Sequence, residues 1–143
     1  MSNKKIGVNG FGRIGRYFTR LAILDPNVEV TLVNDLSDIQ TLMHLFKFDS
    51  IHGRFDLDFE IKGNQVLFSN GKKLSFSQEK YPECIPWNEY GTNTVVECTG
   101  LFLTEDSASK HFVGGAKKVI LSAPAKDPDI KTIVLGVNEN SIS

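Results

Sequence analysis

The feature that most constrains the fold of this chain is a group of three glycines, Gly10, Gly12 and Gly15, set between two patterned segments. Residues 4–9 (KKIGVN) are typical of a short strand, and the residues after the glycines carry apolar side chains at helical spacing. Glycines between such segments favour a turn that leads the backbone directly from a strand into a helix. The sequence therefore predicts the opening of a βαβ unit.

The alternation of strand and helix continues along the chain. Residues 28–33 form an apolar run that ends at Asn34 and Asp35, and residues 38–46 again show helical spacing. Later elements are predicted as strands at 94–98, 119–121 and 133–135 and a helix from Thr104 to about Val113, closed by Gly114 and Gly115. Strands joined by helical crossovers run parallel, so we expect an open sheet with helices on both faces.

Residues 48–77 depart from this alternation. We expect an irregular loop over residues 48–55, followed by short alternating runs between Asp56 and Ser77. Gly63-Asn64 and Asn70-Gly71 separate these runs and favour two-residue hairpin turns, which indicates a small antiparallel insert. The predicted fold class is α/β, a Rossmann-like doubly wound, mostly parallel sheet with this insert, in one domain over residues 1–143.

Composition excludes several classes of protein and site. The 143 residues are 41% hydrophobic, and 16 Lys and Arg against 17 Asp and Glu leave a net charge of -1, so no overall field attracts nucleic acid or an anionic membrane. The apolar runs are too short for a membrane span, and glycines interrupt the segment after Lys5, so we expect no signal peptide and a cytoplasmic location. Cys84 and Cys98 lack metal-site spacing, so we expect neither a metal nor a disulfide framework.

The glycine spacing GxGxxG also has a chemical meaning. The first glycine permits a tight turn, the second lets a pyrophosphate approach the backbone, and the third lets the helix pack closely on the strand. Asp35 lies 20 positions beyond Gly15, where a carboxylate accepts hydrogen bonds from ribose hydroxyls and repels a 2'-phosphate. We therefore predict dinucleotide binding, with NAD favoured over NADP. The alternative is that Asp35 only ends a strand or caps the next helix.

Two further segments follow predicted strands, at the edge where open parallel sheets bind ligands. These are Thr99-Gly100 and Ser122-Ala123-Pro124. Their spacing fits a surface for a cofactor and fits ordinary strand-ending turns equally well.

Five segments together resemble glyceraldehyde-3-phosphate dehydrogenase. They are VNGFGRIGR (8–16), VNDL (33–36), FDSIHGRF (48–55), ECTGLFLT (97–104) and SAPAKD (122–127), in the order and approximate spacing of that family. The resemblance implies an NAD-dependent, phosphorylating oxidoreductase of glycolysis that oxidises glyceraldehyde 3-phosphate to an acyl phosphate, as a cytoplasmic homotetramer.

The resemblance also implies a set of cofactor-binding residues. They are Asn9, Gly10, Phe11, Gly12, Arg13, Ile14, Asn34, Asp35, Lys80, Thr99, Gly100, Phe102 and Ser122. In this set the backbone amides of Arg13 and Ile14 approach the pyrophosphate, Lys80 lies beside the adenine, and Ser122 approaches the nicotinamide. Leu36 matches forms that prefer NAD. The segment EKYP (79–82) departs from the more usual Glu-Arg-Asp-Pro and bears on the contact expected from Lys80.

The resemblance further places a nucleophilic cysteine, in a Ser-Cys-Thr-Thr-Asn segment, shortly beyond Ser143. We therefore expect a truncated chain that binds NAD without dehydrogenase turnover and self-associates through uncovered apolar surface. Neither Cys84 nor Cys98 has a base beside it in the sequence, and the histidines have no such partner, so no catalytic residue is predicted. Two alternatives stay open: the cofactor domain of erythrose-4-phosphate dehydrogenase, and a non-enzymatic nucleotide-binding module.

Overall fold

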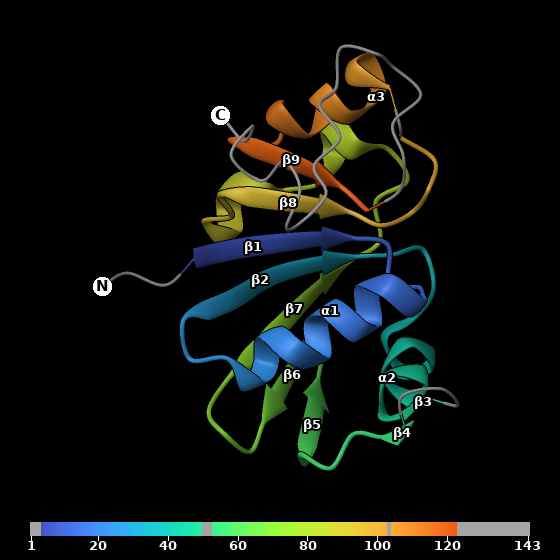
Figure 1. Cartoon of the computed structure of the whole chain (residues 1–143), viewed down its shortest axis with the longest axis vertical. Helices are drawn as coiled ribbons and strands as arrows, with labels where there is room; N and C mark the ends of the chain where they lie inside the picture. The colour runs from blue at the N-terminus through green and yellow to red at the C-terminus, as the bar shows by residue number, and fades with distance from the viewer. Residues whose placement is uncertain (1–3, 50–52, 103, 123–143) are drawn as a thin grey trace, which may run out of the picture.

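Apolar strands alternating with amphipathic helices build a seven-stranded sheet, drawn in Figure 1 from a computed structural model that describes residues 4–49, 53–102 and 104–122. The strands are β1 (Lys4–Asn9), β2 (Val28–Asn34), β5 (Phe59–Lys62), β6 (Gln65–Phe68), β7 (Lys73–Ser77), β8 (Thr94–Glu97) and β9 (Lys118–Leu121). The helices are α1 (Arg13–Leu24), α2 (Ile39–Lys47) and α3 (Glu105–Ser109), and short 3-10 turns cover Pro82–Cys84, Trp87–Tyr90 and Lys110–Phe112.

The strand order is β5-β6-β7-β2-β1-β8-β9. The pairs β1–β2, β2–β7, β1–β8 and β8–β9 are parallel, whereas β5–β6 and β6–β7 are antiparallel. From β1 the chain first builds toward β2 and β7, and it later returns to the other side of β1 with β8 and β9. This is the predicted α/β, doubly wound and mostly parallel sheet with an antiparallel insert, and its chain order reverses at β1.

Three predictions of local structure are wrong in detail. The expected loop over residues 48–55 contains a two-stranded pairing of β3 (Phe48–Asp49) with β4 (Gly53–Arg54). Gly63-Asn64 forms the two-residue turn that was predicted, but the second hairpin closes through three residues, because the N–H of Phe68 donates to the carbonyl of Lys72. The helix after Thr104 ends at Ser109 and tightens into a 3-10 turn. The strand predicted at 133–135 lies outside the described residues.

Two apolar cores lie on opposite faces of the sheet, because successive side chains of a strand point to opposite sides. Val8 and Val33 belong to the core covered by α1 and α2, whereas Leu32 and Val95 belong to the core that contains Trp87. In the second core the indole packs on β1 so closely that a Cβ at Gly7 would come within 2.3 Å of the Trp87 ring. Gly7 is therefore the residue that lets the second core reach the central strand.

The antiparallel insert is tied to the end of α1. The ammonium group of Lys72, in the turn between β6 and β7, donates to the carbonyl oxygens of Ala22, Asp25 and Val28, over 3.3 Å to Ala22 and 2.6 Å to Val28. Asn70 adds a hydrogen bond of 3.0 Å to the carbonyl of Ile23. A cation beside the carbonyls at a helix C-terminus is favourable, so this turn caps α1.

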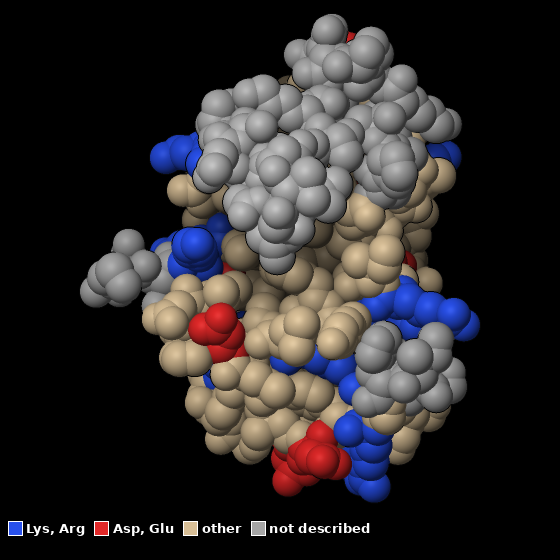
Figure 2. All heavy atoms as spheres, viewed as in Figure 1, with Lys and Arg blue, Asp and Glu red and all other residues tan. Residues whose placement is uncertain are grey.

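The surface that carries α1 is mixed in character. Figure 2 shows both basic and acidic groups on that face, beside a broad area of uncharged surface. Four large apolar side chains of α1 are exposed, namely Ile14, Tyr17, Leu21 and Leu24. Among residues 4–49, 53–102 and 104–122, no helix combines the length and the apolar character that crossing a bilayer requires.

Candidate functional site

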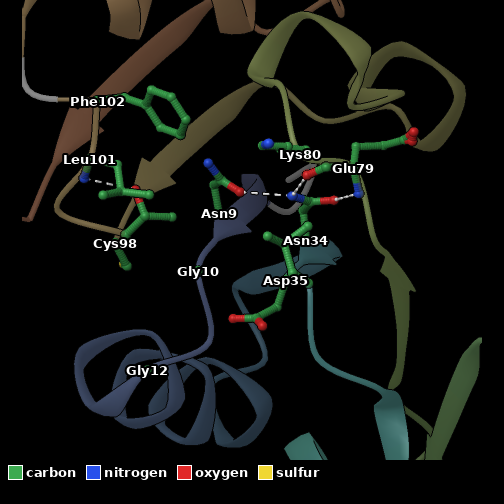
Figure 3. Close-up of a pocket in the computed structure, with 12 residues that line it drawn as sticks. Asn9, Gly10, Gly12, Asn34, Asp35, Glu79, Lys80, Cys98, Leu101 and Phe102 are labelled. Atoms are coloured by element: carbon green, nitrogen blue, oxygen red, sulfur yellow. Dashed lines mark hydrogen bonds between the residues drawn. The ribbon is translucent and has the colours of Figure 1, made fainter.

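A pocket of about 320 Å³ lies at the carboxyl ends of the central strands, where the chain order reverses at β1 (Figure 3). Open α/β sheets bind ligands in this crevice because no crossover helix covers it. The pocket is lined by Asn9, Gly10, Gly12, Asn34, Asp35, Leu36, Glu79, Lys80, Cys98, Thr99, Leu101 and Phe102. The lining thus comes from the ends of β1, β2 and β8 and from the segment that follows β7.

The glycine turn and the start of α1 form one wall of this pocket. Gly10 has a φ of +95°, which side-chain-bearing residues rarely adopt, and a Cβ there would also come within 2.8 Å of Thr99. At Gly12, by contrast, no described atom lies within 4 Å of the position that a Cβ would take. Gly12 is the N-cap of α1 and supplies no side-chain cap, so no side chain at this position competes for the first-turn N–H groups. This wall suits an anionic group.

Gly15 brings α1 onto this turn. A Cβ at Gly15 would come within 2.2 Å of the carbonyl oxygen of Gly10, which only a glycine avoids without a backbone shift. The turn itself is tied to β2, because the N–H of Gly10 donates to the carbonyl of Asn34 over 2.8 Å. The third glycine therefore has the packing role that its spacing predicts.

Asp35 is held by two backbone donors at the edge of the pocket. Its Oδ2 accepts from the N–H of Phe11 over 2.8 Å, and its Oδ1 accepts from the N–H of Ser37 over 2.9 Å. The residue is half-buried, and Figure 3 shows its carboxylate directed toward the turn at Gly12. Each carboxylate oxygen has a second lone pair, so the group can also accept hydrogen bonds from the hydroxyls of a sugar.

A row of polar residues crosses the carboxyl ends of four neighbouring parallel strands. The register pairs Ser77 of β7 with Asn34 of β2, Asn34 with Asn9 of β1, and Asn9 with Glu97 of β8. Asn34 Nδ2 donates to Asn9 Oδ1 over 2.9 Å and to the carbonyl of Glu79 over 2.8 Å. Asn34 Oδ1 accepts from the hydroxyl of Ser77 and from the N–H of Glu79. Asn34 therefore uses its whole side-chain amide to support the pocket wall at Glu79.

Glu97 closes this row and shapes the loop after β8. Its side chain is fully buried, and its carboxylate accepts from Asn9 Nδ2, His111 Nε2, and the N–H and hydroxyl of Thr99. The hydroxyl of Thr99 in turn accepts from the N–H of Leu101 over 3.0 Å. The loop therefore takes its shape from one buried carboxylate.

The structure brings eight of the thirteen predicted cofactor-binding residues to this pocket: Asn9, Gly10, Gly12, Asn34, Asp35, Lys80, Thr99 and Phe102. Arg13, Ile14, Gly100 and Ser122 lie on the adjoining helix start and loops, outside the lining. Phe11 points the other way, because its ring is buried against Phe46 and Phe76 and only its N–H faces Asp35.

Three lining residues and one supporting residue are absent from the set of site residues predicted from the sequence. Glu79, Cys98 and Leu101 line the pocket, and each directly precedes a predicted site residue in the chain. This adjacency is the sequence feature from which they could have been predicted. Glu97 supports the lining, and its signal was a lone acidic residue at the end of an otherwise apolar strand, TVVEC. Leu36, noted in the sequence only as matching forms that prefer NAD, also lines the pocket.

No cysteine paired with a base is found among the described residues. Burial raises the pKa of the half-buried Cys98 thiol, and a hydrogen bond with Ser122 offsets that effect only in part. His111 is buried between Trp87 and Glu97, and the indole N–H of Trp87 donates to its Nδ1 over 3.1 Å. In the part of the chain that the structure describes, no three His, Cys, Asp or Glu side chains gather in a way that could hold a metal.

Known proteins similar to this chain belong to the family that the sequence motifs resemble. The family profile described as "Glyceraldehyde 3-phosphate dehydrogenase, NAD binding domain" matches residues 4–105. The chain is 52% identical over 136 residues to glyceraldehyde-3-phosphate dehydrogenase of Geobacillus stearothermophilus. The matched region covers 95% of this chain and 40% of that protein. The chain is 49% identical over 136 residues to glyceraldehyde-3-phosphate dehydrogenase 1 of Bacillus subtilis, with the same coverage. The chain thus spans about 40% of the length of these curated relatives.

Proposed function

The chain belongs to the family of the glyceraldehyde-3-phosphate dehydrogenase NAD-binding domain, and on this premise we propose that its pocket holds NAD through the residues at the carboxyl ends of β1, β2, β7 and β8. The observation that carries the proposal is the open space at Gly12. It is bounded by the uncapped start of α1 and by the Asp35 carboxylate. A diphosphate and an adjacent sugar require these two features side by side.

Each part of the pocket takes one part of the cofactor in this proposal. The first-turn N–H groups of α1, including those of Arg13 and Ile14, bind the diphosphate, and Asp35 binds the adenosine ribose. Lys80 lies beside the adenine, and Ser122 lies on the nicotinamide side. The adenosine is flanked by Thr99, Gly100 and Phe102. Asn9 and Asn34 form the floor, and Asn34 acts by supporting the wall at Glu79, since its amide is already used in protein contacts.

We also propose an activity for the whole protein, based on its relatives, which are glyceraldehyde-3-phosphate dehydrogenases. Bound NAD supplies a hydride acceptor for the oxidation of an aldehyde. The proposed substrates are glyceraldehyde 3-phosphate and phosphate, with an acyl phosphate as product, and the proposed assembly is a homo-oligomer. Residues 1–143 act as one cofactor-binding domain and do not turn over aldehyde by themselves, because neither Cys84 nor Cys98 is activated by a neighbouring base among the described contacts.

Isothermal titration calorimetry of the purified chain with NAD tests the proposed site, with Gly12→Ala as the diagnostic variant. The wild type is expected to saturate with NAD. Gly12→Ala is expected to fold normally, because its added methyl meets no atom of the described residues, and to bind NAD about tenfold more weakly, because the methyl enters the space for the diphosphate. Asp58→Ala serves as a control, since Asp58 is exposed and lies outside the pocket.

The same samples test the proposed lack of turnover. No NADH is expected when NAD and phosphate are mixed with glyceraldehyde 3-phosphate or with erythrose 4-phosphate. Failure of well-folded wild type to saturate at millimolar NAD would rule out the proposed cofactor site. NADH formation by the purified chain would instead contradict only the proposal about turnover.

A further inference from the structure

Glu97 holds an unusual position for an acidic residue. Its side chain is fully buried at the end of β8. Asn9 and Thr99 both donate hydrogen bonds to Glu97, and both also line the pocket proposed for NAD. Four hydrogen-bond donors converge on its two oxygens. Oε1 accepts from Asn9 Nδ2 over 2.6 Å and lies 2.8 Å from His111 Nε2, whereas Oε2 accepts from the N–H of Thr99 over 2.9 Å and from its hydroxyl over 2.5 Å.

The contacts of His111 show that its imidazole is neutral. The indole N–H of Trp87 is only a donor, so Nδ1 of His111 accepts that hydrogen bond and carries no proton. The proton therefore lies on Nε2, which donates to Glu97. The carboxylate of Glu97 is thus balanced by four neutral donors, and it has no donor function of its own in this arrangement.

A group that only accepts hydrogen bonds fixes the orientation of its neighbours. Asn9 has to turn its Nδ2 toward Glu97, which leaves its Oδ1 to accept from Asn34. Asn34 then has to present its Oδ1 to the N–H of Glu79, because its Nδ2 is engaged with Asn9 and with the carbonyl of Glu79. The acceptor-only carboxylate of Glu97 at one end of the row and the backbone N–H of Glu79 at the other end therefore require the same direction for the hydrogen bonds between them.

We infer that Glu97 is a positioning residue for the NAD site: its buried carboxylate sets the orientation of the Asn9 and Asn34 amides and thereby places both walls of the pocket. One wall is the loop held through Thr99, and the other is the segment at Glu79 held through Asn34. The inference rests on the proposed function, because it assigns the row a purpose in cofactor binding. Glu97 touches no part of the proposed cofactor position and acts only through its neighbours.

Glu97→Gln tests this inference because glutamine keeps the shape and loses the acceptor-only character. If the NH2 of the new amide turns toward Thr99, it faces the backbone N–H of Thr99, so two donors meet and that N–H loses its acceptor. If the NH2 turns toward Asn9, both asparagine amides have to reverse, and Asn34 then faces the N–H of Glu79 with its own donor. Either orientation leaves a backbone N–H in one pocket wall without an acceptor, which is costly in a buried site.

Two measurements on the full 143-residue chain read out this effect. NMR without ligand is expected to show slow hydrogen exchange of the backbone N–H groups of Thr99 and Glu79 in wild type, and fast exchange of one of the two in Glu97→Gln. Calorimetry is expected to show NAD binding weakened at least about tenfold in Glu97→Gln. Val95→Ala is the matched control, because Val95 is buried in the same strand and its loss lowers stability without changing the row.

The outcomes separate positioning from a general loss of stability. Slow exchange at both Thr99 and Glu79 in folded Glu97→Gln, or NAD affinity equal to that of wild type, overturns the inference and leaves the NAD site intact. Equal loss of affinity in Val95→Ala also overturns it, since destabilisation alone would then suffice. Glu97→Asp keeps the charge but withdraws it from Asn9, so it provides the same test if Glu97→Gln does not fold. Wild type that fails to bind NAD contradicts the proposed function itself.

Discussion

The carboxylate of Asp35 accepts a hydrogen bond from the backbone N–H of Phe11 over 2.8 Å, so the acid at the end of β2 is bound to the glycine turn after β1. The two sequence features that predict dinucleotide binding are therefore in direct contact. Because the second oxygen of Asp35 is held by Ser37, the carboxylate is oriented before any ligand arrives. A group that is oriented in advance binds without the entropic cost of being ordered.

Asp35→Asn is expected to weaken NAD binding about tenfold and to reduce the preference for NAD over NADP. The asparagine keeps the size of the side chain but can accept at only one oxygen, and it no longer repels a 2'-phosphate. Calorimetric titrations with both cofactors measure the two effects. Asp58→Asn is the control, as an exposed acid outside the pocket. Unchanged affinity for both cofactors in Asp35→Asn would show that Asp35 only ends the strand.

Gly15→Ala is expected to lower the free energy of unfolding by about 2 kcal/mol or more. Its Cβ would lie 2.2 Å from the carbonyl oxygen of Gly10, and a backbone atom cannot move aside without displacing α1 from the turn. Urea denaturation followed by circular dichroism measures the loss. Gly12→Ala in the same helix start is the matched control and should retain wild-type stability, because no described atom lies within 4 Å of its added methyl. Equal stabilities of the two variants would contradict the close packing at Gly15.

Lys72→Met is expected to lower the free energy of unfolding by about 2 kcal/mol. The substitution keeps a long, flexible side chain and removes the ammonium group that binds the carbonyls of Ala22, Asp25 and Val28. Chemical denaturation measures the change, with Lys73→Met as control because Lys73 is exposed at the start of β7. If both lysine variants unfold at the same denaturant concentration, the cap on α1 contributes nothing to stability.

The two cysteines are expected to react with a thiol reagent at different rates near neutral pH. Cys84 is exposed, whereas burial raises the pKa of Cys98 and keeps its thiol protonated. The variants Cys84→Ser and Cys98→Ser each leave one thiol, so the rates are measured separately. Bound NAD should slow Cys98 further, because Cys98 lines the pocket, and should leave Cys84 unchanged. Faster reaction at Cys98 than at Cys84 would contradict this assignment.

The raised pKa of Cys98 also predicts a dependence of stability on pH. Unfolding exposes the thiol and restores its ordinary pKa, so the unfolded chain releases a proton first as the pH rises. The contribution of Cys98 to stability is therefore complete below about pH 8.5 and declines as the pH approaches the folded value. Thermal unfolding across the alkaline range should show a smaller loss for Cys98→Ser than for wild type. Parallel losses in both chains would contradict the linkage.

The parts of the fold that follow from local patterns were predictable. Period-two and helical spacing gave β1, α1, β2 and α2 close to their observed bounds, and the motif spacing placed Asp35 beside the glycine turn. The strands β3 and β4 were missed because each has two residues, which is too short for any periodicity. The cap from Lys72 was missed because it joins residues 44 to 50 positions apart, and only the packing of the insert on α1 brings them together.

The row of polar residues from Ser77 to Glu97 could not be predicted from the sequence for a related reason. Asn9 and Glu97 are 88 positions apart, and their contact depends on the register of β1 against β8. A shift of one residue in that register would turn the carboxylate to the opposite face of the sheet. The resemblance to the family supplied Asn9 and Asn34 as site residues, but the supporting role of their amides is visible only from the pairing of the strands.

The packing of Trp87 against Gly7 gives the chain an internal optical probe. Trp87 is the only tryptophan of the 143 residues, and its indole is fully buried between the central strand and the imidazole of His111. Its fluorescence therefore comes from one place, the side of the sheet away from α1. Loosening of that side on heating, or through substitutions near β8, can be followed by emission while circular dichroism follows the secondary structure of the whole chain.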